Sequence, residues 1–311
     1  MKGNQKIKFL MIDESRGCPN ACHFCIHPIK SGNRWRLLDV SKIIDLMDRL
    51  GHKLGTTAFR LAGSNTPARL RNDLAGEIIK QGLKVKYVGY GHARDAGADD
   101  YELLRKSGCA SLFYGVESGS QEILDEDINK HVKVEQIAQA LKEAKKAGLL
   151  TVASLIVPCP HDTPETLKQT LDLLVDANPD SVVMSLPGVI PGTAWYANSG
   201  KFGFKLNEDY IERVMVYKIR LLLPLALWEP TPYQISGKTH YESIAMAQWL
   251  AMELEKKGII TGMEDYLLLA ANYLNISRKE VRDRSRKLFF TGDYAGIESL
   301  VNVFNERVAT V

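Results

Sequence analysis

Three of the five cysteines of the chain lie within one short stretch, as Cys18, Cys22 and Cys25. Thiolates packed this closely repel one another unless a metal neutralises them, so the spacing predicts a metal site. A closed zinc site or a fully ligated iron–sulfur cluster takes four protein ligands. This stretch offers three thiolates and no fourth nearby, which predicts a metal or a cluster with one open position. The strand-like run 8–14 leads directly into it.

Strand-like and helix-like segments alternate along the first two thirds of the chain, which predicts an α/β fold. We expect strands at 8–14, 56–62, 85–91, 110–116, 149–157 and 181–186. Between them we expect helices at 39–50, 70–81, 101–107, 134–148 and 163–177. Right-handed crossovers make such strands parallel, so the pattern predicts a partial (β/α)6 TIM-like barrel. Ligands then lie at the carboxyl ends of the strands, where the cysteines also lie.

The pattern changes after about residue 207, where only helices are expected, at 244–257, 264–274, 277–290 and 295–307. We therefore predict a barrel domain of residues 1–204 followed by an all-helical C-terminal region of residues 205–311. The polar and basic residues 27–36, directly after the cysteines, are expected to form a loop.

Composition excludes several classes of protein. The formal net charge of +3 gives no large field for nucleic acid, and no apolar run reaches membrane-spanning length. The first residues lack the hydrophobic core of a signal peptide, so a cytoplasmic location is expected. Cys109 and Cys159 lie far apart and are expected to be buried apolar residues, not disulfide partners.

The cysteine stretch, with Phe24 in its aromatic position, resembles the signature of the radical S-adenosylmethionine (SAM) superfamily, C-x₃-C-x-aromatic-C after the first barrel strand. The resemblance implies that the three cysteines hold three irons of a [4Fe–4S] cluster and that SAM chelates the fourth. The alternative from the spacing alone is a zinc site completed by His27 or by a distant residue.

The resemblance also implies a SAM site built from the strand ends. The family often binds the amino group of SAM through Gly-Gly-Glu after the second strand, where this chain has Gly63-Ser64-Asn65 and no glutamate. Main-chain carbonyls or Asn65 would then bind that group. The remaining predicted SAM contacts are Phe24, Glu117 in a Gly-Val-Glu-Ser-Gly-Ser segment, Ser154, and Val157 in a stretch like the family's I-x-G-x-P-G-E-T.

Four further residues are candidates for the substrate side of the site: Tyr90, His92, Arg94 and Tyr114. They follow or end the third and fourth predicted strands, beside glycines that allow close approach of a ligand to the backbone. A lone histidine such as His92 is more often structural than catalytic.

The motifs resemble the branch of the superfamily that holds cobalamin-dependent enzymes, methylthiotransferases and their relatives. Seventeen residues precede Cys18 in this sequence, so no upstream cobalamin domain is expected. The resemblance implies hydrogen abstraction by a 5′-deoxyadenosyl radical from a small-molecule or peptide substrate, with a reductant such as flavodoxin or ferredoxin.

Three alternatives remain open. One is a cobalamin-type radical methyltransferase with cobalamin supplied in trans, and a second is a non-catalytic zinc-binding module. The third is RNA binding by the basic run 277–287, for which a solvated helix face is favoured because it carries acids and no stacking aromatics.

Overall fold

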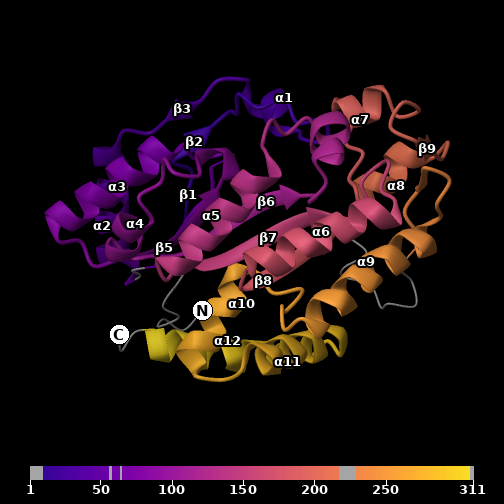
Figure 1. Cartoon of the computed structure of the whole chain (residues 1–311). Helices are drawn as coiled ribbons and strands as arrows, with labels where there is room; N and C mark the ends of the chain where they lie inside the picture. The colour runs from indigo at the N-terminus through magenta and orange to yellow at the C-terminus, as the bar shows by residue number, and fades with distance from the viewer. Residues whose placement is uncertain (1–9, 56–57, 64, 217–228, 309–311) are drawn as a thin grey trace.

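The computed structural model describes residues 10–55, 58–63, 65–216 and 229–308 (Figure 1). Within these residues, its main sheet has six strands in the order β1-β4-β5-β6-β7-β8, and every neighbouring pair is parallel. Their bounds are β1 Leu10–Ile12, β4 Ala58–Leu61, β5 Lys86–Gly91, β6 Cys109–Glu117, β7 Leu150–Ile156 and β8 Ser181–Ser185. The predicted parallel partial barrel is confirmed.

Helices cross over between successive strands and cover the sheet (Figure 1). They are α2 Val40–Leu54, α3 Ala68–Gln81, α4 Tyr101–Lys106, α5 Val134–Lys146 and α6 Pro164–Ala177. Local signals explain their ends: Thr163 caps the start of α6 by accepting a bond from the Thr166 N–H, and Gly82 ends α3 in the left-handed conformation. Their apolar faces and the sheet share one large core.

Shorter elements surround the cysteine loop. β2 Ser15–Arg16 pairs antiparallel with β3 Arg36–Leu37, and α1 His27–Ser31 lies between them. The expectation of a plain loop over residues 27–36 was therefore wrong, because Pro28 starts a helical turn that Gly32 ends. The other short elements are η1 Ala93–Asp95, the π-helix η2 Ile123–Ile128 and α7 Ala194–Ala197.

The C-terminal region is helical, as expected, apart from one strand. β10 Tyr233–Ile235 pairs antiparallel with β9 Phe204–Leu206, which runs across the predicted domain boundary. The helices are α8 Tyr210–Val216, α9 His240–Lys256, α10 Asp265–Leu274, α11 Arg278–Phe290 and α12 Tyr294–Val308.

The C-terminal helices pack against the barrel. Leu250 and Leu254 of α9 join the main core, and Leu268 of α10 packs in a cluster with Val152 of β7. In Figure 1 these helices lie below the sheet, away from α1 and β3 at the top. Among the described residues, no helix is both long and apolar enough to cross a membrane.

Candidate functional site

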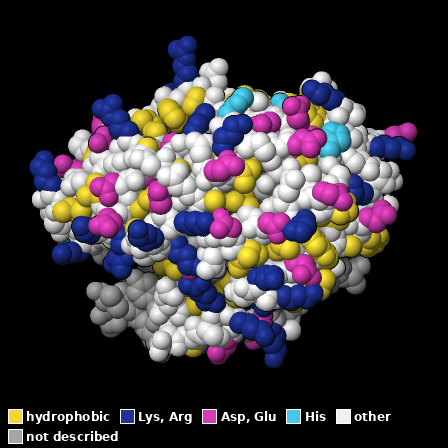
Figure 2. Space-filling model, viewed as in Figure 1, with side chains coloured by type: hydrophobic (Ala, Val, Ile, Leu, Met, Phe, Trp, Pro, Cys, Tyr) yellow, Lys and Arg dark blue, Asp and Glu magenta, His cyan; other side chains and the backbone are white. Residues whose placement is uncertain are grey.

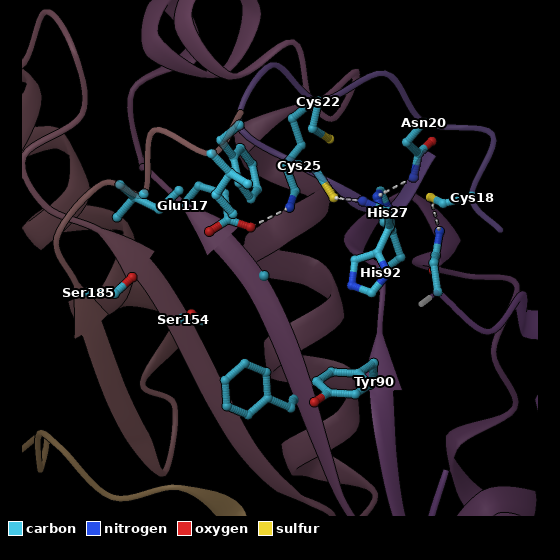
Figure 3. A pocket seen from close by; sticks show the side chains of 18 of the residues that line it. Cys18, Asn20, Cys22, Cys25, His27, Tyr90, His92, Glu117, Ser154 and Ser185 are labelled. Atoms are coloured by element: carbon cyan, nitrogen blue, oxygen red, sulfur yellow. Dashed lines mark hydrogen bonds and ion pairs between the residues drawn. The ribbon is translucent and has the colours of Figure 1, made fainter. Parts of the chain in front are cut away.

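A cavity of about 500 Å³ lies at the carboxyl ends of the strands, within the size range of small-molecule sites. The three cysteines of the 18–25 loop form part of its wall (Figure 3). Strand ends supply the rest, including Tyr90 of β5, Glu117 of β6 and Ser154 of β7. The topology therefore brings together residues from most of the barrel, as the parallel order requires.

The sulfur atoms of Cys18, Cys22 and Cys25 face a common space in Figure 3. The backbone fixes the loop at both ends: Cys18 N–H donates to the Gly32 carbonyl at 3.1 Å, and Cys25 N–H donates to the Cys22 carbonyl at 3.1 Å. Gly17 has φ of +80°, and a Cβ there would lie 2.1 Å from the Arg34 carbonyl oxygen. Only glycine fits where the loop begins.

The thiols are set in surroundings that disfavour a bare thiolate. Burial raises the pKa of the Cys22 thiol to about 11, although the nearby Lys130 ammonium opposes the shift. Burial also raises the pKa of Cys25, while the His27 N–H, 3.5 Å from its sulfur, lowers it. Because a bound metal ion replaces the thiol protons, these residues fit ligands whose negative charge a metal neutralises.

A cluster and a zinc ion make different demands on the three cysteines. A closed zinc site takes four protein ligands, whereas a [4Fe–4S] cluster that leaves one iron open takes three. The loop supplies three cysteines to the cavity wall. His27, the fourth ligand of the zinc alternative, also lines the cavity, and its buried Nδ1 has no hydrogen-bond partner among the described residues. The three cysteines therefore match the open cluster, and His27 is the donor that the zinc alternative would add.

The π-helix η2 and the turn after it hold the cysteine loop in place. His23 N–H donates to the Ile128 carbonyl at 2.9 Å, and the Asn129 side chain donates to the Ala21 carbonyl at 2.9 Å. Trp195 donates from Nε1 to the Asp127 carbonyl at 2.9 Å. The cysteines are thus fastened to an element more than a hundred residues later in the chain.

The turn after η2 also places Lys130 at the cavity wall, a residue that the sequence analysis did not predict. Its Nζ lies 2.8 Å from Glu117 Oε1, and both side chains are over nine-tenths buried at the cavity wall. Glu117 ends β6 with φ of +64°, where the β6–β7 register shifts, and this turns its carboxylate toward the cavity. The site therefore contains a buried carboxylate and a buried ammonium side by side.

Glu14, two residues after β1, has a carboxylate beside the turn that follows β4, and the sequence analysis did not predict it. Gly63 N–H donates to Glu14 Oε2 at 3.0 Å, and the Thr66 hydroxyl makes a short bond to Oε1. Burial raises the pKa of Glu14, while these hydrogen bonds lower it. The turn after β4 thus has a glutamate partner, which comes from the segment after β1 and not from the turn itself.

The predicted turn itself is only partly at the cavity. Asn65 lines it, and its Nδ2 lies 3.9 Å from Cys18 Sγ. Gly63 lies behind it, against Glu14 and Ser15, where a Cβ would have no room. Ser64 lies outside the described residues.

The substrate-side candidates divide into two groups. Tyr90 and His92 line the cavity with Phe113, whose ring meets the Tyr90 ring edge-on. Burial and nearby cations lower the pKa of His92 to about 3, so it is neutral at pH 7. Arg94 does not line the cavity; it bonds instead to Asn20 Oδ1, and Asn20 Nδ2 lies 3.2 Å from His92 Nε2.

Tyr114 and Val157 lie elsewhere than expected. Tyr114 is 1% exposed, and its hydroxyl is 3.4 Å from the Tyr101 hydroxyl beneath the helices. Successive strand residues face opposite sides, so Phe113 and Gly115 face the cavity and Tyr114 does not. Val157 is 1% exposed in the main core and does not line the cavity.

Two arginines of the basic run in α11 form ion pairs within the protein. Arg282 is 5% exposed and pairs with Glu255 and with Asp283. Arg278 pairs with Asp180 at 2.9 Å. These contacts favour the reading of α11 as a packed and solvated helix.

The fold and the cysteine loop define a class of protein, the partial-barrel enzymes with a three-cysteine cluster motif. The sequence profile of the radical SAM superfamily matches residues 14–174, just over half of the chain. The chain therefore belongs to the radical SAM superfamily, whose members are enzymes that use a [4Fe–4S] cluster and SAM.

Curated relatives match part of the chain. An uncharacterized methyltransferase of Pyrococcus horikoshii is 26% identical over 189 residues, covering 60% of this chain and 41% of that protein. The anaerobic magnesium-protoporphyrin IX monomethyl ester cyclase of Rubrivivax gelatinosus is 31% identical over 170 residues, covering 53% of this chain and 30% of that protein. The chain thus spans less than half the length of these relatives.

Among solved structures, the radical SAM methyltransferase TsrM of Kitasatospora setae, with cobalamin and a [4Fe–4S] cluster bound, superposes with a TM-score of 0.64. The match covers 90% of this chain and 61% of TsrM at 15% sequence identity. This similarity establishes a shared fold that extends beyond the barrel into the C-terminal region.

Proposed function

We propose that Cys18, Cys22 and Cys25 hold three irons of a [4Fe–4S] cluster and leave the fourth iron for SAM. The observation that carries the proposal is the set of three cysteine sulfurs facing one space at the cavity wall. When bound and reduced, the cluster supplies the electron that splits SAM into methionine and a 5′-deoxyadenosyl radical, which abstracts hydrogen from the substrate.

The buried pair Glu117 and Lys130 is proposed to bind the charged end of SAM. SAM carries a carboxylate and an ammonium, and Lys130 presents a buried cation at the cavity for the former. The Glu117 carboxylate is proposed to accept hydrogen bonds from the ammonium or from the ribose hydroxyls of SAM. Phe24, Asn65 and Ser154 also line the cavity and complete the proposed cofactor contacts.

Two predicted cofactor positions act less directly in this proposal. Gly63 supports the turn through Glu14, and Val157, directly after β7, packs in the main core. Ser64 stays a sequence-based prediction. Tyr90 and His92 are proposed to face the substrate, with Arg94 holding His92 through Asn20.

Residues 1–204 are proposed to carry the cofactor chemistry. Residues 205–311 are proposed to support the substrate side through Tyr210 and Tyr233, whose hydroxyls donate to the Val189 and Pro187 carbonyls of the loop at the cavity wall. The substrate proposed is a small molecule or a peptide, and the electron comes from a reductant such as flavodoxin or ferredoxin. A cytoplasmic location suits a site of free thiols and a cluster that must be reduced.

A second candidate is radical methyl transfer with cobalamin supplied by a partner chain or a further segment. The Pyrococcus horikoshii relative is named as a methyltransferase, and the fold shared with TsrM includes most of the C-terminal region. This candidate predicts that added cobalamin causes the enzyme to form S-adenosylhomocysteine, which simple hydrogen abstraction does not form.

The test is anaerobic reconstitution with iron and sulfide, followed by dithionite and SAM, with 5′-deoxyadenosine as the product measured. We expect 5′-deoxyadenosine from the native chain and from the control Cys109→Ala, because Cys109 is buried in the core away from the cavity. We expect none above background from Cys25→Ala. Equal product from Cys25→Ala and the native chain would refute the ligand assignment.

A further inference from the structure

The segment after the cysteine loop forms an exposed surface of apolar and cationic side chains. Its apolar members are Ile29, Trp35 and Leu37, which are 55%, 38% and 43% exposed. Its cations are Lys30, Arg34 and Arg36, all exposed. We name these six residues the loop surface. In Figure 2, dark-blue and yellow side chains both occur along the upper edge of the molecule, where Figure 1 places β3 and α1.

The loop surface has a strong local charge in a nearly neutral protein. No Asp or Glu occurs in residues 15–38, whereas the same stretch contains four Lys and Arg residues. Arg16 pairs with Asp13 at 3.0 Å, outside the surface. Across the described residues, Lys30, Arg34 and Arg36 have no ion-pair partner within 4.0 Å. Their charges are therefore free to attract an acidic partner.

The segment that carries the loop surface lies directly against the cysteine loop. α1 begins two residues after Cys25, and the His27 N–H lies 3.5 Å from Cys25 Sγ. At the other end of α1, the Gly32 carbonyl accepts from Cys18 N–H at 3.1 Å. The Arg34 carbonyl lies against Gly17. A protein bound here would contact the segment whose backbone holds Cys18 and Cys25.

We propose that the loop surface is the docking site of an acidic one-electron carrier protein. The inference rests on the proposed function, because that function needs one electron from outside for each SAM molecule cleaved. One electron leaves the reduced flavin or iron–sulfur centre of the carrier and enters the cluster, and no proton or chemical group moves with it. The cations accelerate encounter with an acidic carrier, and Ile29, Trp35 and Leu37 form the desolvated contact.

Exposed aliphatic side chains favour a protein over a nucleic acid as the partner. Ile29 and Leu37 offer no stacking face and no hydrogen bond to bases, whereas they suit an apolar patch on a protein. Trp35 is of a type enriched among interface anchors. An anionic oligonucleotide is therefore the control ligand for the experiment.

The test compares two triple variants of the reconstituted holoenzyme. The first is Lys30→Gln with Arg34→Gln and Arg36→Gln. The control is Lys53→Gln with Lys84→Gln and Lys146→Gln, which removes the same charge from exposed side chains near the opposite ends of the barrel strands. Four irons per chain in each variant would show that the cluster assembles normally.

Two electron sources separate docking from chemistry. With dithionite, which needs no docking site, we expect both variants to form 5′-deoxyadenosine at the native rate. With an enzymatically reduced acidic flavodoxin as donor, we expect the loop-surface variant to be about tenfold slower and the control to stay within about twofold. The deficit should shrink at high ionic strength, because salt screens the native attraction.

Direct binding gives a readout that does not depend on activity. By calorimetry, we expect the flavodoxin to bind the loop-surface variant about tenfold more weakly than the native protein or the control. Trp35→Ala should weaken binding with little change in its salt dependence. Equal flavodoxin binding and equal flavodoxin-driven rates in both triple variants would overturn the proposal. It would also be overturned if the loop-surface variant lost binding to the anionic oligonucleotide but bound flavodoxin as the native protein does. If dithionite yields no 5′-deoxyadenosine from the native chain, the proposed function fails while calorimetry still decides the docking claim.

Discussion

Arg71 is expected to be the residue outside the cavity on which the site most depends. It lies on α3, is 2% exposed, and forms a two-pronged pair with Asp99 at 2.9 and 2.8 Å. The same guanidinium pairs with Asp95 at 2.8 Å and donates to the Tyr90 carbonyl at 3.1 Å and to the Thr66 carbonyl. It therefore joins the turn after β4, the end of β5 and the turn η1 that follows β5.

Replacing Arg71 by Met leaves two carboxylates without their buried cation. Removing one partner of a buried ion pair costs about 3–5 kcal/mol of unfolding free energy. For 311 residues, an unfolding entropy of about 2.1 cal/mol/K per residue totals about 0.65 kcal/mol/K. The melting temperature of Arg71→Met should therefore fall by about 5–8 °C. Because the Tyr90 and Thr66 carbonyls lose a donor, 5′-deoxyadenosine formation should also slow.

Calorimetry and the dithionite assay test this prediction with a neighbour as control. Arg69 lies on the same helix, but its side chain is 92% exposed and pairs with Asp73 only at 3.6 Å. Arg69→Met should change the free energy of unfolding by less than about 0.5 kcal/mol. Arg71→Lys keeps the charge but loses the two-pronged geometry, so its melting temperature should lie between those of Arg69→Met and Arg71→Met. A melting temperature for Arg71→Met within about 1 °C of the native value would refute the reasoning.

Three further predictions concern pH, backbone and the predicted substrate side. Burial raises the pKa of Asp162 to about 6, above its unfolded value, so its contribution to stability is present at low pH and is lost as pH rises from about 4 to about 6. In urea unfolding, the stability of the native chain relative to Asp162→Asn should fall by about 2–3 kcal/mol between pH 4 and 7, and a flat difference would contradict this. Gly17→Ala should lower iron content and stability, because its Cβ would meet the Arg34 carbonyl at 2.1 Å; normal iron content would argue against the loop geometry. Tyr114→Phe loses only the 3.4 Å bond to Tyr101, so it should cost at most about 1 kcal/mol and keep 5′-deoxyadenosine formation, whereas loss of product would return Tyr114 to the site.

The sequence predicted the barrel because local signals and the global fold agree along it. Apolar runs, helix caps such as Thr163 and stops such as Gly82 mark nearly every element of the sheet and its crossover helices. Parallel order then places the cysteine loop at the strand ends without further information. Elements of two to five residues, such as α1 and β3, carry too few residues for any periodicity and were missed.

Glu117 was predicted from its motif, but Glu14 and Lys130 could not be, because their partners are distant in the sequence. Glu14 meets Gly63 only when β1 and β4 pair, and Lys130 reaches Glu117 only through the turn after η2. Tyr114 was predicted on the substrate side, whereas the structure turns it away from the cavity, for a different reason. β6 is mostly buried on both faces, so hydrophobicity does not reveal which residues face the cavity.

The central claim concerns an iron that the protein leaves for SAM, and Mössbauer spectroscopy of the protein reconstituted with ⁵⁷Fe tests it most directly. Four irons should be present per chain, and one of the four should change its isomer shift when SAM is added, because only that iron lacks a thiolate. The same four irons with no change on adding SAM, or a single metal ion held by the three thiolates, would contradict the account.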